Sequence, residues 1–380
     1  MRRYLLSLGA LALSLSVASA CSLCGGAYRS TPTLRQEAGF ASARMILHGA
    51  ITDSSLDKGE SDFDIKSVLR DDKSLKGKKK IVLGRWMPVE DKKNPPQYLL
   101  FCDVDRKGTG VDPYRGIPVR GPRTIDYVKK ALALDKKDVA GNLVFFFGYL
   151  DDSDPEVARD AFLEFARADD ADIIKAAPKL DAAKLRKWLA DPKTPAVNNS
   201  VYAMLLGACG KAGDAALLTK LLDSAEDRYQ NAADGLMAGL VALDARKGWA
   251  MVQDVVSDGR KPLSLRMRVT GTLRFLHGAK PKESKAEILK AMKSLLLHSD
   301  LADMAIADLA SFKLWDLTKD VLACHGKKGY ESPLLVRAIY RYALSAPATE
   351  ETKAFLDARR KDDPETLKEA EEVLRLERAG

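Results

Sequence analysis

The 380-residue sequence has few of the residues that usually carry chemistry, with five cysteines and four histidines. The patterns H-E-x-x-H, G-x-S-x-G, the P-loop and a paired C-x-x-C are absent; these mark zinc-peptidase, serine-hydrolase, nucleotide and metal sites. Three histidines, His277, His298 and His325, fall at expected helix C-termini, where the helix dipole favours an imidazolium. We therefore expect no enzyme, metal or cofactor, with catalytic groups scattered along the chain as the alternative.

The sequence also lacks an apolar run long enough to cross a membrane, which takes about 20 residues. The run from Tyr4 to Val17 follows two arginines and ends before Ala18-Ser19-Ala20-Cys21. A basic start, a short apolar segment and a small-residue cleavage site predict a secretory signal peptide over residues 1–20. We expect an exported protein whose mature form begins at Cys21, and a buried N-terminal helix is the alternative.

The residues Ala18 to Cys21 also resemble a bacterial lipobox, in which the cysteine after the cleavage point is acylated. Leucine is usual three positions before that cysteine, where this chain has Ala18. Exported proteins tend to pair their thiols. With a lipid on Cys21, the residues Cys24 and Cys102 remain as a candidate disulfide; without it, one of the three is odd. We favour a lipid-anchored envelope protein, with plain secretion as the alternative.

Charge gives little guidance to partners. The chain has 61 basic and 53 acidic residues, a net charge of +8. The segment from Cys21 to Arg120 holds 18 basic and 13 acidic residues, an excess of +5 (18 − 13), and elsewhere the charges are interspersed. This pattern indicates a solvated exterior. The densest basic run, Lys76 to Lys80, has no interleaved aromatic residues, so we expect no nucleic-acid partner.

The segment from Asp151 to Ala168 predicts a helix that needs a neighbour. Asp154 is a good N-cap, Pro155 suits the first helical position, and apolar residues then recur at helical spacing. Comparable turns recur along the chain. Their markers are Pro155, Pro195, Glu226, Pro262, Leu301, Pro333 and Pro364. The steps of 40, 31, 36, 39, 32 and 31 residues scatter around the roughly 35 to 45 residues of two-helix repeats.

This succession of apolar helix, acidic turn and Asp-Pro helix start resembles the HEAT repeat of armadillo-type proteins, as in exported HEAT-repeat proteins of environmental bacteria. The resemblance implies about seven helix pairs over residues 124–380. They would stack into an all-α superhelical solenoid with capped ends. It implies an extended binding surface and no particular activity.

The chain before this region predicts short strands separated by turns rich in Gly, Pro and Lys. The candidates are Ala41 to Ile51, Phe63 to Leu69, Ile81 to Leu83, Tyr98 to Val104 and Ile117 to Val119. We expect a small all-β barrel over residues 21–110. Residues 111–123, with three prolines and two glycines, predict a linker.

The Cys21 start, the strand Ile46 to Gly49, the paired strand Asp62 to Leu69 and the strand ending in Cys102 resemble the OB barrels of the netrin-like and tissue-metalloproteinase-inhibitor group. In inhibitors of that group, the free amine and carbonyl of the first cysteine chelate the protease zinc. The resemblance implies a second hypothesis, protease inhibition through Cys21, which acylation would abolish. The family's Cys-x-Cys start is Cys21-Ser22-Leu23-Cys24 here, and partner cysteines are missing.

Arginine and tyrosine near the C-terminus predict a binding face made of Arg337, Tyr340 and Arg341, because these residue types are frequent interface anchors. Their spacing requires part of the set to face the core. Our hypothesis is an exported or envelope-anchored binding or scaffold protein, whose partner is a protein or an envelope component. Attachment to the membrane would be through Cys21 alone. The inhibitor and a solenoid enzyme without a known motif are the alternatives.

Cleavage and acylation at Cys21 predict a definite mass. The mature chain from the membrane fraction should carry a diacylglyceryl group on Cys21, and a Cys21→Ser variant should leave that fraction, because one thiol bears the anchor. Intact mass spectrometry of both proteins measures this. A free amine and thiol on Cys21 in the wild type would contradict lipidation and keep the inhibitor hypothesis.

Overall fold

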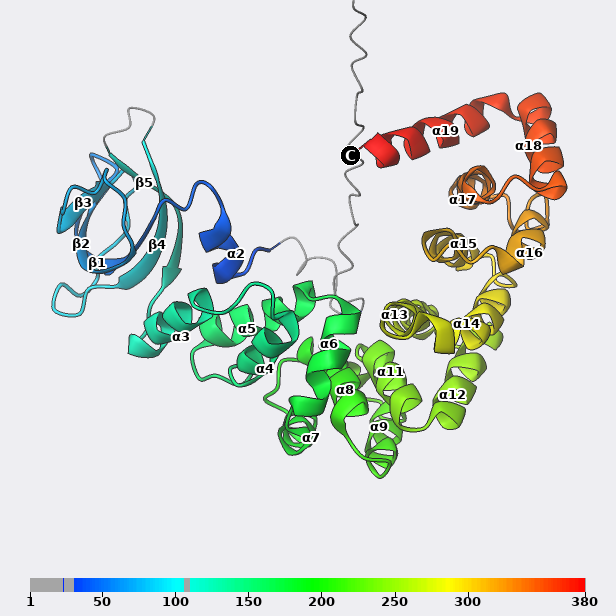
Figure 1. The fold of residues 1–380 in the computed structure, drawn as a ribbon, viewed down its shortest axis with the longest axis horizontal. Coiled ribbons are helices and arrows are strands. Elements are labelled where there is room, and N and C mark those ends of the chain that lie inside the picture. Colours follow the sequence, from blue (N-terminus) through cyan, green and yellow to red (C-terminus); the bar gives the residue numbers. More distant parts are fainter. Residues whose placement is uncertain (1–22, 24–30, 106–109, 380) are drawn as a thin grey trace, which may run out of the picture.

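The computed structural model describes Leu23, residues 31–105 and residues 110–379. Its first part is an antiparallel sheet with the strand order β3-β2-β1-β4-β5, preceded by the short helix α2 (Leu34–Gly39). The strands are β1 (Met45–Ser55), β2 (Glu60–Arg70), β3 (Lys80–Leu83), β4 (Gln97–Val104) and β5 (Val111–Pro118). The prediction of five strands is confirmed in number, although β5 begins six residues before the predicted Ile117 to Val119, and the sheet curls upon itself (Figure 1).

Because side chains alternate along a strand, the sheet has two apolar faces. Met45, Leu47 and Cys102 belong to a buried cluster inside the curled sheet. Their strand neighbours Ile46 and Phe101 belong to a different cluster, which continues through the helices as far as α19. The outer face of the sheet is therefore covered by the helical part of the chain.

Helices fill the chain after the sheet and follow one another around an open arc (Figure 1). The helices in the half of the arc that adjoins the sheet are α3 (Pro122–Leu132), α4 (Val139–Phe147), α5 (Pro155–Arg167), α6 (Asp170–Ala176), α7 (Ala182–Ala190), α8 (Asn198–Cys209), α9 (Asp214–Leu222) and α11 (Ala233–Leu243). The rest are α12 (Ala245–Ser257), α13 (Leu263–Ala279), α14 (Pro281–Leu295), α15 (Ala302–Ser311), α16 (Thr318–Leu322), α17 (Pro333–Ser345), α18 (Glu350–Asp362) and α19 (Pro364–Ala379). Short turns of helix are η1 (Ala177–Lys179), α10 (Asp227–Gln230) and η2 (Trp315–Leu317).

The predicted helix start at Asp154 and Pro155 is confirmed. The Asp154 side chain accepts the Glu156 N–H at 3.0 Å, and Pro155 is the first residue of α5. Pro333 and Pro364 likewise begin α17 and α19. A proline fits there because the first N–H of a helix has no partner within the helix.

The helices α8, α11, α13, α15, α17 and α19 contact one another in that order. Arg268 of α13 lies 3.6 Å from Asp234 of α11, and Arg274 of α13 pairs with Asp308 of α15 at 2.7 Å. Burial raises the pKa of both carboxyl groups. Because an unpaired buried carboxylate is costly, these pairs favour one alignment of neighbouring helices.

The predicted linker over residues 111–123 is wrong. Its first eight residues form β5, which pairs with β4 from Tyr98↔Pro118 to Val104↔Val111. Val119 is buried in the shared core, and α3 starts at Pro122 directly after its N-cap, Gly121. Proline is tolerated here because β5 is an edge strand of the sheet.

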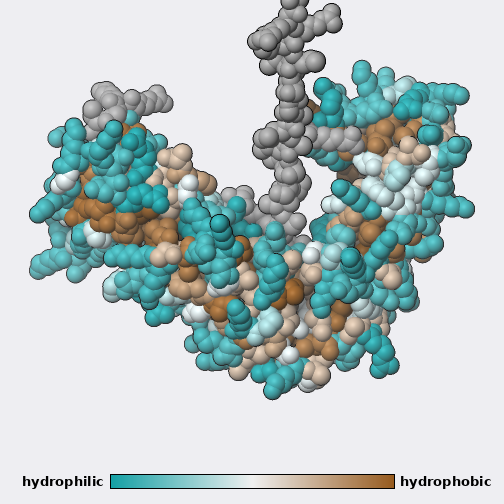
Figure 2. Space-filling model, in the orientation of Figure 1, coloured by the Kyte–Doolittle hydropathy of each residue, from teal (hydrophilic) through white to brown (hydrophobic). Residues whose placement is uncertain are grey.

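Figure 2 shows a surface that is mostly hydrophilic, with apolar patches over the sheet and among the last helices. Within the described residues, no helix combines the length and the apolar character needed to cross a membrane.

Glycines set the spacing of α8 and α11. A side chain added at Gly235 would overlap the carbonyl oxygen of Ser200, and one added at Gly207 would overlap the backbone of Gly239. The two helix backbones therefore approach more closely than any larger residue would permit.

Gly235→Ala should destabilise the protein by about 2 kcal/mol or more, because a packed helix pair must move apart. Gly213→Ala is the matched control: Gly213 has right-handed backbone angles, and a side chain there meets nothing within 4 Å. We expect the control to change the free energy of unfolding by less than about 0.5 kcal/mol. Urea unfolding followed by circular dichroism measures both, and equal effects would contradict the packing argument.

Candidate functional site: a groove between two helix turns

Of the predicted Cys24–Cys102 disulfide, the structure describes Cys102 alone. Cys102 is a free thiol, fully buried inside the curled sheet, where burial raises its pKa to about 12. Leu23, by contrast, packs in the cluster on the outer side of the sheet. The pairing of Cys102 with Cys24 stays a prediction, because the structure does not describe Cys24. Cys21 and Cys24 lie outside the described residues.

Tyr340 is fully buried, so its predicted place on a binding face is wrong. Its hydroxyl donates to Asp363 Oδ2 at 3.0 Å and lies 3.2 Å from His325 Nε2. Arg359 also reaches the His325 ring, at 3.3 Å from Nδ1. This cluster links α17 to the ends of α16 and α18, and its role is structural.

Arg337 and Arg341 lie on the accessible side of α17, but both are paired with α19. Arg337 contacts Glu369 at 2.8 Å and Arg341 contacts Glu377 at 2.5 Å. They border a cavity of about 560 Å³ between α15, α17 and α19, which we call the inner groove. Its floor is formed by residues with small side chains, Ala307 and Ala338. The predicted face of three residues is thus reduced to two arginines on one side of this groove.

A second cavity, of about 550 Å³, lies between the α4–α5 turn and the α7–α8 turn. We call it the turn groove. The first turn contributes Asp151 and Asp152, and the second contributes Asp191 and Lys193. These turns are two of those that the sequence marked with Pro155 and Pro195. They are consecutive in the series of turns, so the stacking of the helix pairs brings them together.

The floor of the turn groove is aromatic and held in place by hydrogen bonds. Trp188 of α7 lies 4.9 Å from Tyr202 of α8, between ring centres, and the Trp188 indole N–H donates to Asp151 Oδ2 at 3.1 Å. The Tyr202 hydroxyl donates to the Leu150 carbonyl at 3.3 Å and accepts from Asn198 at 3.1 Å. Burial raises the pKa of Tyr202, which therefore stays protonated. The floor is thus preorganised for an apolar group.

The acidic residues of the groove are engaged within the protein. Asp151 holds the Trp188 indole, and the fully buried Asp152 side chain pairs with Arg123 at 2.6 Å. Asp191 Oδ1 accepts the backbone N–H of Lys193 at 2.9 Å.

The basic residues of the groove are different. Arg159, Lys187 and Lys193 line it and are exposed, and among the described residues none of the three lies within ion-pair distance of a carboxylate. With the Asp152–Arg123 pair counted as neutral, the groove has three exposed cations against the carboxylates of Asp151 and Asp191, a net charge of +1 (3 − 2) around an aromatic floor.

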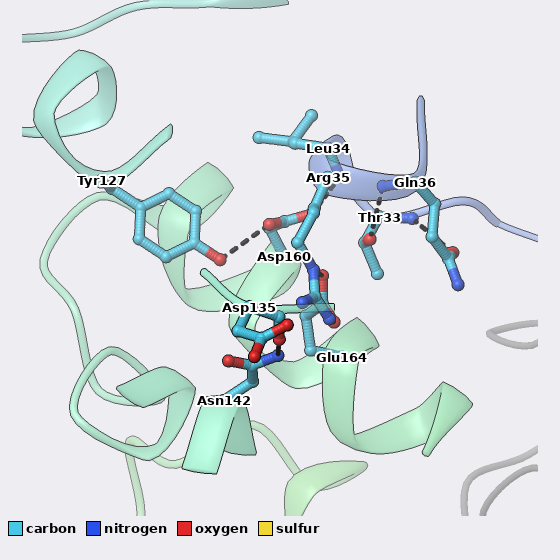
Figure 3. Close-up of polar contacts among 9 residues, drawn as sticks. All are labelled: Thr33, Leu34, Arg35, Gln36, Tyr127, Asp135, Asn142, Asp160 and Glu164. Carbon is cyan, nitrogen blue, oxygen red and sulfur yellow. Dashed lines mark hydrogen bonds and ion pairs between the residues drawn. The ribbon is translucent and has the colours of Figure 1, made fainter. Parts of the chain in front are cut away.

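A buried polar cluster fixes how the sheet meets the helices (Figure 3). Asp160 of α5 is buried, and its two carboxylate oxygens accept the Leu34 N–H and the Tyr127 hydroxyl, each at 2.7 Å. Leu34 is the first residue of α2, so Asp160 satisfies one of that helix's unpaired N–H groups. Desolvation outweighs these bonds and raises the pKa of Asp160 to about 7.

Two ion pairs complete the cluster. Arg35 of α2 pairs with Glu164 of α5 at 2.7 Å, and Arg115 of β5 pairs with Glu37 of α2. The helix α2 is consequently wedged between the sheet and α5, with a charged contact to each.

Metal binding finds no support in the structure as far as it is described: no three His, Cys, Asp or Glu residues of that part are close enough together to hold an ion.

Comparison with known proteins identifies no relative: no family model, no curated protein and no solved structure matches this chain.

The sequence marked both turns of the turn groove but missed the groove itself. Trp188 stands two residues before the end of α7 and three before Asp191, so an aromatic residue beside a marked turn was the available signal. Its pairing with Tyr202 and Asp151 depends on stacking of separate helix pairs, which spacing alone does not show.

The raised pKa of Asp160 makes stability depend on pH. The carboxyl group binds its proton more tightly in the folded protein, with a pKa of about 7, than at its ordinary value of 3.8. Its contribution to stability is therefore greatest below pH 4 and is lost as the pH rises towards 7. Relative to the wild type, Asp160→Asn should gain about 2 kcal/mol of unfolding free energy between pH 5 and pH 8, because the amide cannot ionise.

Urea unfolding at the two pH values measures this difference. Asp126→Asn, an exposed change on the neighbouring helix α3, is the control and should show the same pH dependence as the wild type. The assignment fails if Asp160→Asn also keeps the wild-type dependence.

Proposed function

We propose that this chain is an exported, envelope-attached scaffold that binds protein partners, built as a small OB-like barrel followed by a HEAT-like α-solenoid. The observation that carries the proposal is the single apolar core that runs from Leu23 through the sheet to Ala370 of α19. It makes a long, rigid arc from short helices. A surface of this kind suits large partners more than small substrates.

Export and attachment remain the part of the proposal that rests on the signal-peptide pattern at residues 1–20 and on the lipobox-like residues before Cys21. A partner would then be met in the cell envelope. Because nucleic acids are not expected in the cell envelope, the partner is a protein or an assembled envelope component.

The inner side of the arc supports protein binding through its shape and composition. The inner groove has an alanine floor, and Leu334 and Val373 at its borders are 67% and 41% exposed. Exposed apolar residues bordered by ion-paired side chains resemble the apolar centre and the polar rim of protein interfaces. The ion pairs of Arg337 and Arg341 keep this groove in shape.

The inner side should be needed for partner capture. Ala307→Glu with Ala338→Glu places two carboxylates on the floor of the inner groove and should reduce capture at least about tenfold. Ala216→Glu with Ala250→Glu makes the same chemical change at exposed positions of α9 and α12, on the outer side (Figure 1), and should leave capture unchanged.

Capture is measured by quantitative mass spectrometry after pull-down from the detergent-solubilised envelope with each full-length variant. A protein lost only with the inner pair is a partner of the inner side. If every captured protein is equally reduced by both pairs, or by neither, binding by the inner side is refuted.

A further inference from the structure

We propose that the turn groove binds an extended acidic segment of a partner protein, with one large apolar side chain of that segment seated on the aromatic floor. This inference rests on the proposed function, because it takes the ligand to be part of a protein partner. It adds the chemistry of the segment and a second contact point, away from the inner groove.

Charge complementarity selects an acidic ligand. Asp152 and Arg123 neutralise each other, while Arg159, Lys187 and Lys193 are exposed and have no carboxylate in ion-pair distance within the described chain. The other two carboxylates of the groove, Asp151 and Asp191, accept the Trp188 indole N–H and the Lys193 backbone N–H, so the groove keeps a net charge of +1 (3 − 2). The three cations come from α5, α7 and the turn after α7, so they border the groove on both sides. Carboxylates spaced along an extended chain can reach cations on both sides, whereas a single small anion cannot.

The floor selects an apolar anchor. Trp188 and Tyr202 are buried, and their polar atoms are already bonded to Asp151 and Leu150. Val197, at the groove, is 43% exposed. A large apolar side chain placed here would remove its own surface and that of Val197 from water without leaving a polar group of the floor unpaired.

An extended backbone suits the groove better than a helix. The groove is lined by two turns, Leu150 to Asp154 and Asp191 to Val197, together with one face of α5 and parts of α7 and α8, whereas a helix with its side chains is about 10 Å wide. At about 550 Å³ it has room for a few residues of chain.

The probe is a short fluorescein-labelled peptide with phenylalanine at its centre and Asp or Glu on both sides. Fluorescence anisotropy with the full-length protein should show saturable binding that weakens as salt is raised, because exposed charges are screened. A peptide with lysine in place of each acid should bind at least about tenfold more weakly, and so should one with glycine in place of phenylalanine.

Two variants with equal change in charge locate the site. Lys187→Glu with Lys193→Glu should weaken binding of the acidic peptide about tenfold. Lys220→Glu with Lys247→Glu, at exposed positions of α9 and α12, should weaken it less than about twofold. Thermal melting confirms that all four lysine changes leave the fold intact.

The proposal is overturned if the acidic peptide does not bind, if the lysine peptide binds as well or better, or if both double variants weaken binding equally. None of these outcomes touches partner capture by the inner groove, since that depends on Ala307 and Ala338. Loss of capture with intact peptide binding would instead refute the proposed use of the inner side and leave the turn groove assigned.

Discussion

The fold depends on one constraint: no helix in the described part of the chain can shield its apolar side from water by itself. The helices are short, and their buried faces meet mainly neighbouring helices of the arc, with a further contact between α6 and α13. The sheet is subject to the same constraint, since Ile46 and Phe101 on its outer face are covered by helical residues. Stability therefore comes from the packing of each helix or strand against its neighbours, and no element is stable alone.

Polar groups then decide which neighbour arrangement is adopted. Buried or partly buried pairs such as Arg274–Asp308 and Arg35–Glu164 add little net stability, because desolvation offsets their attraction. Misalignment would leave a buried carboxylate without its partner, which is costly. The Asp160 cluster acts in the same way at the sheet junction, where it joins α2, α3 and α5 (Figure 3). The sheet is thus fixed relative to the arc, in place of the linker that prolines and glycines predicted.

This rigidity matters for the proposed function. A scaffold that presents two grooves to one partner must hold them at a constant separation, because avidity is lost when geometry prevents simultaneous binding. The close approach of α8 and α11 at Gly235 lies between the turn groove and the inner groove along the chain. Glycine is needed there for spacing, so the helix pairs on either side keep one relative position.

Local patterns in the sequence determined the first four strands, the helix start at Pro155 and the turns before Pro333 and Pro364, because caps and periodicity act over a few residues. Only the tertiary structure decided that residues 111–118 complete the sheet, that Cys102 faces away from the outer core, that Tyr340 is buried, and that Trp188 meets Tyr202 in a groove. The physical reason is that each of these depends on which faces of distant elements come together, and burial and charge pairing across the fold settle that choice.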